Sequence, residues 1–255
     1  MYKNICIYRE FTYVNNRIFT QLIFYVKFGI FTYVSNRIFT QFIFYVKICI
    51  FTYVNNKILT QEEAKEVSDT VLSMRDNFTK RGIFDTLGAS VYLDNLMDYV
   101  DLSDKMNPLL YSKFNKLYEK LIEKITLMIH VPVKLHPYGA LPGFHIFGDD
   151  SNGHQGHKHI DQPYQRILWP EPFHMPFSFT LAINVPEKAG LEVWPKTNTE
   201  EPEYVDYEVG HMYSHVGHVM HRIAGVGNPT DNNPRITLQG HGAILSDSQE
   251  AVIYF

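Results

Sequence analysis

The chain has 255 residues, of which 45% are hydrophobic and 20% charged, with a formal net charge of −4 at pH 7. These values are typical of a globular protein. The charge is unevenly distributed: residues 1–56 carry six Lys or Arg residues and one Glu, a net of +5, and the remainder carries about −9. This acidic balance excludes nucleic acid as the expected partner of the main domain.

Cysteine and histidine are also unevenly placed. The two cysteines, Cys6 and Cys49, lie in the basic N-terminal part, so no disulfide supports the remainder. This predicts a reducing compartment, namely the cytoplasm. All twelve histidines fall between His130 and His241, as expected if a metal site concentrates them.

The N-terminal part is a tandem repeat of 20 residues. Phe11–Ile30 and Phe31–Ile50 differ at four positions, and a third copy starts at Phe51 and ends near Gln61. A basic residue recurs every ten positions, so no apolar run reaches the roughly 18–20 residues that span a bilayer. We predict that residues 1–56 are an appendage outside the main domain; a membrane or partner anchor is the alternative.

The main domain is predicted to cover residues 57–255, with helices between 57 and 129. Thr60-Gln-Glu-Glu63 is a capping box, and the apolar residues that follow it have helical spacing up to about Asn77. A second helix is predicted over Ser112–Ile129. We interpret both helices as scaffold.

Residues 130–255 have the pattern of a β core. Short apolar or alternating runs are separated by turns rich in Gly, Pro, Asn and Asp. The predicted strands are Val131–Leu135, Phe144–Phe147, Ile160–Arg166, Phe177–Val185, Leu191–Trp194, Tyr204–Glu208, His211–His215, Val219–Ile223, Arg235–Leu238 and Ala251–Phe255. The fold class is therefore mainly β with flanking helices, as a double-sheet jelly roll or barrel.

One short motif stands out in this β part. His159 and Asp161 are two residues apart, so on a strand their side chains project to the same side. A second imidazole, from His221 sixty residues beyond Asp161, would complete the three-ligand face of non-haem iron sites. Fourteen residues after His221 come Arg235 and, two further on, Thr237.

This set resembles the iron(II)- and 2-oxoglutarate-dependent dioxygenases, over about Pro137–Gly242. Between the ligands, Leu181–Asn184 and Gly190–Trp194 are also similar to that family. The resemblance implies a double-stranded β-helix of the jelly-roll (cupin-like) type. It further implies that Fe(II) is held by His159, Asp161 and His221. It also implies that the C5 carboxylate of 2-oxoglutarate is held by Arg235 with Thr237.

The implied reaction uses O2 to decarboxylate 2-oxoglutarate to succinate and CO2 and to hydroxylate a substrate. We expect a small molecule, with an amino acid or peptide as the other possibility. His145 and Tyr138 are predicted to bond the cosubstrate or the substrate. Trp169, Phe173, His174 and residues 149–158 are predicted to line the entrance or, for the aromatic residues, to belong to the core.

The chemistry of the residues agrees with these roles. A buried dicarboxylate needs a fixed cation, and a guanidinium offers two parallel donors. On a strand Thr237 shares a face with Arg235. The turn Gly225–Pro234 predicts that the strands carrying His221 and Arg235 pair as antiparallel neighbours.

Other interpretations remain open at this point. A cupin-like metal barrel, catalytic or serving only as a binding module, would not need Arg235 or Thr237. A zinc site on one loop could use His154, His157 and His159. The second imidazole ligand also has rivals in the sequence: His211, His215 and His218.

Overall fold

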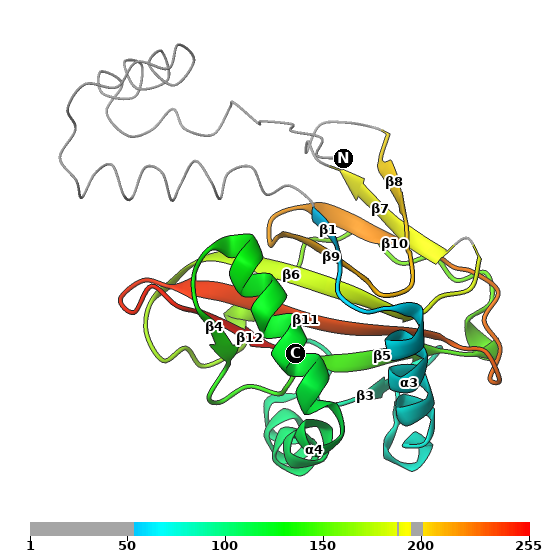
Figure 1. Cartoon of the computed structure of the whole chain (residues 1–255), viewed down its shortest axis with the longest axis horizontal. Coiled ribbons are helices and arrows are strands. Elements are labelled where there is room, and N and C mark those ends of the chain that lie inside the picture. Colours follow the sequence, from blue (N-terminus) through cyan, green and yellow to red (C-terminus); the bar gives the residue numbers. More distant parts are fainter. Residues whose placement is uncertain (1–53, 188, 195–200) are drawn as a thin grey trace. The chain divides into compact units, whose positions relative to one another are not determined.

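The computed structural model describes residues 54–187, 189–194 and 201–255, so the tandem repeats of residues 1–50 lie outside it. The described chain folds around two sheets, antiparallel except for one parallel strand pair, with helices against one of them (Figure 1). The elements are β1 (Val54–Lys57), α3 (Gln61–Leu72), η1 (Arg75–Asn77), β2 (Thr79–Lys80), β3 (Asp85–Leu87), α4 (Leu96–Ile129), β4 (Val133–Leu135), β5 (Gly143–Phe147), η2 (Asp149–Ser151), η3 (Pro163–Gln165), β6 (Phe173–Asn184), β7 (Ala189–Trp194), β8 (Glu203–Asp206), β9 (His211–Val216), β10 (Met220–Val226), β11 (Arg235–Leu245) and β12 (Ala251–Tyr254).

The larger sheet has the order β1-β9-β6-β11-β5-β3-β2, with β12 pairing both β11 and β4. The smaller sheet is β10-β7-β8, and an isolated bridge between His159 and His221 adds one more segment at its β10 edge. Apolar side chains from the two sheets pack together, as in the cluster that joins Ala182 and Tyr213 to Leu191 and Val193. The predicted double-sheet jelly roll is confirmed.

Helix α3 begins as the sequence predicts. The Thr60 hydroxyl accepts the Glu63 N–H at 3.2 Å, and the Glu63 carboxylate accepts the Thr60 N–H at 3.1 Å. The helix buries Ala64 and Val71 and ends at Leu72, five residues before the predicted end. The chain then tightens into the 3-10 turn η1, so residues 73–77 are not α-helical.

Helix α4 starts at Leu96, well before the predicted start at Ser112. Pro108 is a residue that usually breaks helices, yet it lies inside this one, which is kinked at Phe114. An interior proline costs about 3 kcal/mol, whereas burying one large apolar side chain contributes about 1.5–3 kcal/mol. Met106 and Leu110 flank Pro108 and are buried to 1% and 0% exposure, so their burial outweighs the local cost.

Two further predictions about strands are wrong. Ile160–Arg166 is a loop containing η3, because Pro163 lacks an N–H for a ladder and takes the first position of the 3-10 turn. The strands of His221 and Arg235 are not neighbours either. Strand β10 pairs with β7, whereas β11 pairs with β5, β6 and β12, so the two lie in different sheets.

Strand β11 separates an apolar face from a polar one. Ile236 and Leu238 are fully buried on the face toward the helices, where Phe144 of the neighbouring strand meets Phe114 of α4 with ring centroids 4.8 Å apart. On that face a Cβ at Gly240 would come within 2.3 Å of the Phe179 ring, so the glycine leaves space for it. The alternate residues of β11 face the interior between the sheets: Arg235, Thr237, Gln239 and His241.

Strand β1 lies at the edge of the larger sheet and pairs with β9 from Val54↔Ser214 to Lys57↔His211. The domain start predicted at residue 57 therefore falls inside a strand, and the third repeat copy supplies this edge. Among the described residues, no helix combines the length and apolarity needed to cross a membrane.

We propose that the folded unit begins just before Val54. A chain starting at Thr52 is expected to melt several degrees higher than one starting at Ile58. The shorter chain loses the β1 ladder, each of whose bonds contributes about 0.5–1.5 kcal/mol net, and 1 kcal/mol shifts Tm by about 2–4 °C at this size. Calorimetry of both chains is the measurement, and equal Tm values would contradict the proposal.

Candidate metal and carboxylate site

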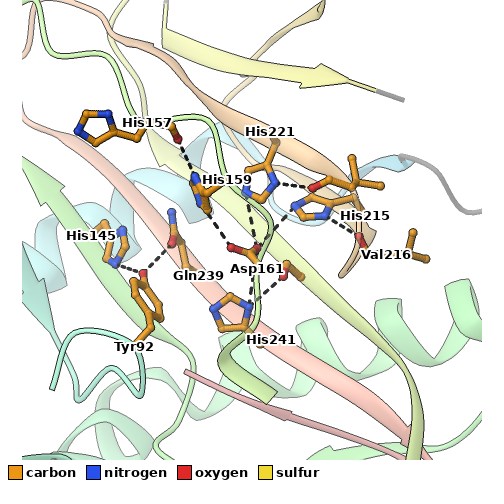
Figure 2. Close-up of polar contacts among 12 residues, drawn as sticks. Tyr92, His145, His157, His159, Asp161, His215, Val216, His221, Gln239 and His241 are labelled. Carbon is orange, nitrogen blue, oxygen red and sulfur yellow. Dashed lines mark hydrogen bonds and ion pairs between the residues drawn. The ribbon is translucent and has the colours of Figure 1, made fainter. Parts of the chain in front are cut away.

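Asp161 lies in the loop after His159 and is surrounded by imidazoles (Figure 2). Its carboxylate oxygens are 3.5 Å from His159 Nε2 and 3.6 Å from His221 Nε2. The bridge between His159 and His221 holds the two histidines opposite each other through reciprocal backbone bonds of 2.9 Å. The ligand atoms of these three residues all lie within 4.8 Å of one another. The structure thus brings together the three predicted metal ligands.

Backbone carbonyls fix the orientation of both histidines. His159 Nδ1 bonds the His157 carbonyl at 2.7 Å, and His221 Nδ1 bonds the Val219 carbonyl at 3.0 Å. A carbonyl can only accept, so each Nδ1 carries a proton, and each Nε2 points toward Asp161, where it can hold a second proton or a metal. Lone pairs converging on a carboxylate repel one another unless a cation lies among them. The donor set therefore fits a divalent metal of the 2-His-1-carboxylate type.

The ionisation states agree with this fit. Burial lowers the pKa of His221 to about 4, so its imidazole is neutral at pH 7. Burial by itself raises the pKa of Asp161, but the bond to His159 and the neighbouring imidazoles outweigh it, and this pKa lies well below its usual range. The pKa of His159 is raised, chiefly by its bond to Asp161, so a metal competes there with a proton.

Two more histidines face the same carboxylate. His215 Nε2 lies 3.9 Å and His241 Nδ1 4.0 Å from Asp161 Oδ2, and both side chains are buried. His215 was a rival metal ligand in the sequence, whereas His241 was missed. Counting alternate residues onward from Arg235 along one strand would have placed His241 on the interior face.

Arg235 is completely buried at the start of β11. Among the described residues, no acceptor meets hydrogen-bond geometry with any of its three guanidinium nitrogens, and the Thr237 hydroxyl also lacks a partner. The Tyr207 hydroxyl is near enough to interact with the guanidinium, but it is a neutral group. The rings of Phe147 and Tyr207 lie 4.9 and 5.4 Å from the guanidinium carbon. Burial lowers the pKa of Arg235 and Tyr207 partly offsets this, but a guanidinium stays charged. A buried cation without an anion indicates an anion-binding position.

His145 lies opposite Thr237 in the β5–β11 register, close to this position. Its Nε2 bonds the Tyr92 hydroxyl at 2.9 Å, and that hydroxyl also reaches Gln239 Oε1 at 3.5 Å (Figure 2). No sequence signal marked Tyr92, which comes from the segment before α4. Tyr138, in contrast, is 62% exposed and packs on His136, so the structure does not place it among the buried side chains around Arg235 and Asp161.

The remaining predicted residues lie outside this group. His211 bonds Asn55 and His218 is exposed, so neither faces Asp161. Within the described chain, the metal-competent group contains His159 but not His154 or His157, which disfavours a zinc site on one loop.

The aromatic residues predicted at the entrance lie together around the start of β6. Trp169 and Phe173 stack on each other with ring centroids 4.1 Å apart. His174 follows Phe173 in β6, and its Nδ1 lies 3.3 Å from the Ser246 hydroxyl.

No protein-family model matches the sequence, and no curated protein matches it significantly. Solved structures do match. An N-substituted L-amino acid dioxygenase in complex with alpha-KG, from Burkholderia ambifaria AMMD, has a TM-score of 0.50 at 10% identity, covering 80% of this chain and 86% of that one. At this identity the similarity shows the fold alone, namely that this chain folds like the matched dioxygenase.

Two further solved structures match with TM-scores below 0.50. An oxidoreductase of the 2OG-Fe(II) oxygenase family from Burkholderia pseudomallei has a TM-score of 0.48 at 12% identity, covering 77% of this chain and 86% of that one. A prolyl-4-hydroxylase from Pseudomonas putida has a TM-score of 0.44 at 10% identity, covering 76% and 94%.

Replacing a ligand residue should abolish tight metal binding. His221→Ala and Asp161→Ala are each expected to weaken Mn(II) or anaerobic Fe(II) binding by at least about 10- to 100-fold, the range for losses of outer-shell partners alone. His157→Ala is the matched control, because its side chain is exposed while its carbonyl still orients His159. Equilibrium dialysis measures the affinity, and unchanged binding in the ligand variants would show that the site is elsewhere.

The buried His145 should make the fold sensitive to acid. Burial, and secondarily Arg235, lowers its pKa to about 3, whereas an unfolded histidine titrates near 6.5. At pH values between these two pKa values, His145 is protonated in the unfolded chain but neutral in the folded chain. The free energy of unfolding therefore falls as pH decreases from about 6.5. At pH 5 this amounts to about 2 kcal/mol.

His145→Gln removes the titrating group, so its loss of unfolding free energy between pH 7 and pH 5 should be smaller than that of the unchanged protein by a similar amount. Urea titrations at the two pH values measure it. Identical losses in both proteins would mean that His145 is free to protonate in the folded state.

Proposed function

We propose that this protein is an Fe(II)- and 2-oxoglutarate-dependent dioxygenase. The reaction consumes 2-oxoglutarate, O2 and a substrate with a C–H bond, and yields succinate, CO2 and the hydroxylated substrate. The observation that carries the proposal is Arg235. A fully buried guanidinium with three unmatched nitrogens occupies the same interior as a 2-His-1-carboxylate group, which suits an acid that binds a metal at one end and a cation at the other.

The metal would be held by His159, Asp161 and His221. Bound Fe(II) supplies redox chemistry at coordination positions that three protein ligands leave open. The protein's part is to fix the imidazoles through the carbonyls of His157 and Val219, and to keep Asp161 ionised. Because the carboxylate is only 17% exposed, its charge acts in a medium that screens it less than water does.

Arg235 and Thr237 would hold the C5 carboxylate of 2-oxoglutarate. The guanidinium fork can give two parallel bonds and Thr237 a third from the adjacent position on the same strand face. His145, bonded to Tyr92, lies opposite Thr237 and narrows this end of the interior. The pKa of His145 is lowered by burial, so it presents an uncharged ring beside the acid and does not compete with Arg235 for it.

A small molecule, an amino acid or a peptide is the substrate class that we propose, in keeping with the acidic balance of residues 57–255. A cupin-like metal barrel that does not use 2-oxoglutarate is the alternative function. It accounts for the three metal ligands but gives no reason for the burial of Arg235 and Thr237 without partners.

Arg235→Met tests the proposal with little change in side-chain volume. A hydrogen bond to a charged group contributes about 1.5–3 kcal/mol, so 2-oxoglutarate affinity should fall about 10- to 150-fold while metal affinity is kept. Without ligand the variant should melt no lower than the unchanged protein, because it removes an unpaired buried charge.

Succinate formation and calorimetric titration with 2-oxoglutarate measure these effects, with Arg75→Ala, an exposed arginine that bonds the Asp231 carbonyl, as control. Unchanged 2-oxoglutarate affinity in Arg235→Met would favour the cupin-like alternative.

A further inference from the structure

A row of buried polar side chains crosses four strands of the larger sheet. Tyr254 of β12 pairs with His241 of β11, His241 with Ser178 of β6, and Ser178 with His215 of β9. Directly paired residues project from the same face of a sheet. The four side chains are at most 6% exposed, so the row lies in the interior, on the face that looks toward Asp161.

One end of this row belongs to the metal site. His215 and His241 both face Asp161 Oδ2 (Figure 2). The Ser178 hydroxyl bonds His241 Nδ1 at 2.9 Å. This places the row beside the metal ligands. Arg235 and Thr237 occupy the opposite end of β11, so the proposed cosubstrate does not account for the row.

The other end of the row has polar atoms with nothing to bond. His241 Nε2 and the Tyr254 hydroxyl lack a partner in the described chain, as does Nε2 of the adjacent His136. The His136 ring lies 5.7 Å from that of Tyr254. Its Nδ1 accepts the Tyr138 N–H at 3.2 Å, so the proton of the neutral ring is on Nε2, a fixed donor. Unsatisfied buried groups are rare and unfavourable, and three together indicate a ligand.

The charge of two of these groups limits what that ligand is. Burial lowers the pKa of His136 to about 4 and raises that of the Tyr254 hydroxyl. Both are therefore uncharged at neutral pH. A charged group brought to them would lose its hydration without gaining an opposite charge.

An apolar wall completes this end. Trp169 stacks on Phe173 and lies nearly perpendicular to the rings of Tyr254 and His136, with centroids 5.7 and 5.4 Å away. Trp169 and Ile167, from the loop that follows Asp161, pack against the cluster containing Tyr254. A ligand here meets polar atoms on one side and aromatic surface on the other.

We propose that Tyr254, His241 and His136 form the substrate subsite, which holds an uncharged amide group with an apolar substituent against Trp169. The fixed His136 Nε2–H donor suits the amide carbonyl. The Tyr254 hydroxyl and His241 Nε2 can accept from the amide N–H. The role of this subsite in catalysis rests on the proposed oxygenase function. Binding of an amide at the subsite can be measured independently of that function.

The full chain carrying Trp194→Phe leaves Trp169 as the single tryptophan, because the sequence has two. Titration with N-acetyl-L-phenylalanine amide should change its fluorescence saturably. N-acetyl-L-phenylalanine, which differs by a charged carboxylate, should bind at least about tenfold more weakly. No saturable change with the amide, or equal binding of the two probes, would overturn the subsite.

Tyr254→Phe should weaken amide binding about 2- to 12-fold, as expected for one neutral hydrogen bond, without lowering Tm. Tyr118→Phe is the matched control: its hydroxyl is also fully buried but bonds the Pro142 carbonyl at 2.9 Å. That variant should melt lower and bind the amide unchanged. If Tyr254→Phe binds the amide like the unchanged protein, the subsite is wrong.

His136 gives a second pair of variants. His136→Asn retains an acceptor near the Nδ1 position and removes the Nε2–H donor, so amide binding should fall. His136→Gln retains a donor near the Nε2 position and should bind more tightly than His136→Asn. The reverse order would count against a donor role for His136.

These outcomes are independent of 2-oxoglutarate binding. If Arg235→Met leaves 2-oxoglutarate affinity unchanged while Tyr254→Phe weakens the amide, the proposed function fails and the subsite stands. If only the Arg235 effect is seen, the function stands and the subsite fails.

Discussion

The site depends on one partly buried carboxylate. Asp161 lies between two sheets, and four imidazoles from a loop and three strands place a nitrogen within 4.0 Å of it. Three of these histidines donate Nδ1–H to a backbone carbonyl within two residues of them in sequence: His159, His215 and His221. Their Nε2 atoms then face a negative charge, and burial lowers the pKa of His215 and His221, so those two imidazoles are neutral. Such an arrangement is unfavourable without a cation. The rest of the fold therefore has to hold the loop and the three strands in the positions that bring these imidazoles to Asp161.

Strand β11 connects that site to the hydrophobic core. Its apolar residues face the helices, where Ile236 and Leu238 are fully buried, and its polar residues face the interior between the sheets. The period of two in a strand makes these faces inseparable, since a shift of register by one residue would exchange them. The packing of α4 against the sheet, maintained across the kink at Phe114, thus also fixes the position of Arg235 and His241.

The two ends of the β11 interior face differ in electrostatics. At one end Arg235 is a buried cation with no acceptor among the described residues, which favours an anion. At the other, Tyr254 is neutral and, like His241, unmatched, which favours a polar but uncharged group. On the two proposals made above, a dicarboxylate and a neutral substrate would bind at opposite ends of this face because their charges differ.

Local sequence determined the parts of this protein whose physics is local. The capping box at Thr60 depends on atoms three residues apart, and it formed as predicted. The spacing of His159 and Asp161, and the alternation of Arg235 with Thr237, are likewise local patterns, and they were sufficient to identify the candidate ligands. The resemblance that these motifs carry also led to the correct jelly-roll fold.

Tertiary structure alone decided the rest. Pro108 stays helical because burial of Met106 and Leu110 outweighs the intrinsic cost of a proline inside a helix. Local helix propensities do not include this contribution from burial. The partner of β10 is β7 rather than β11, since strand pairing is set by the closure of two sheets and not by the turn between consecutive strands. His241 and Tyr92 join the site through cross-strand register and a loop path, contacts that span up to 147 residues of chain. The alternation along β11 could have placed His241 on the interior face. No sequence pattern, however, marks the contact of His241 with Asp161 or of Tyr92 with Gln239, because these contacts form only when the sheets pack.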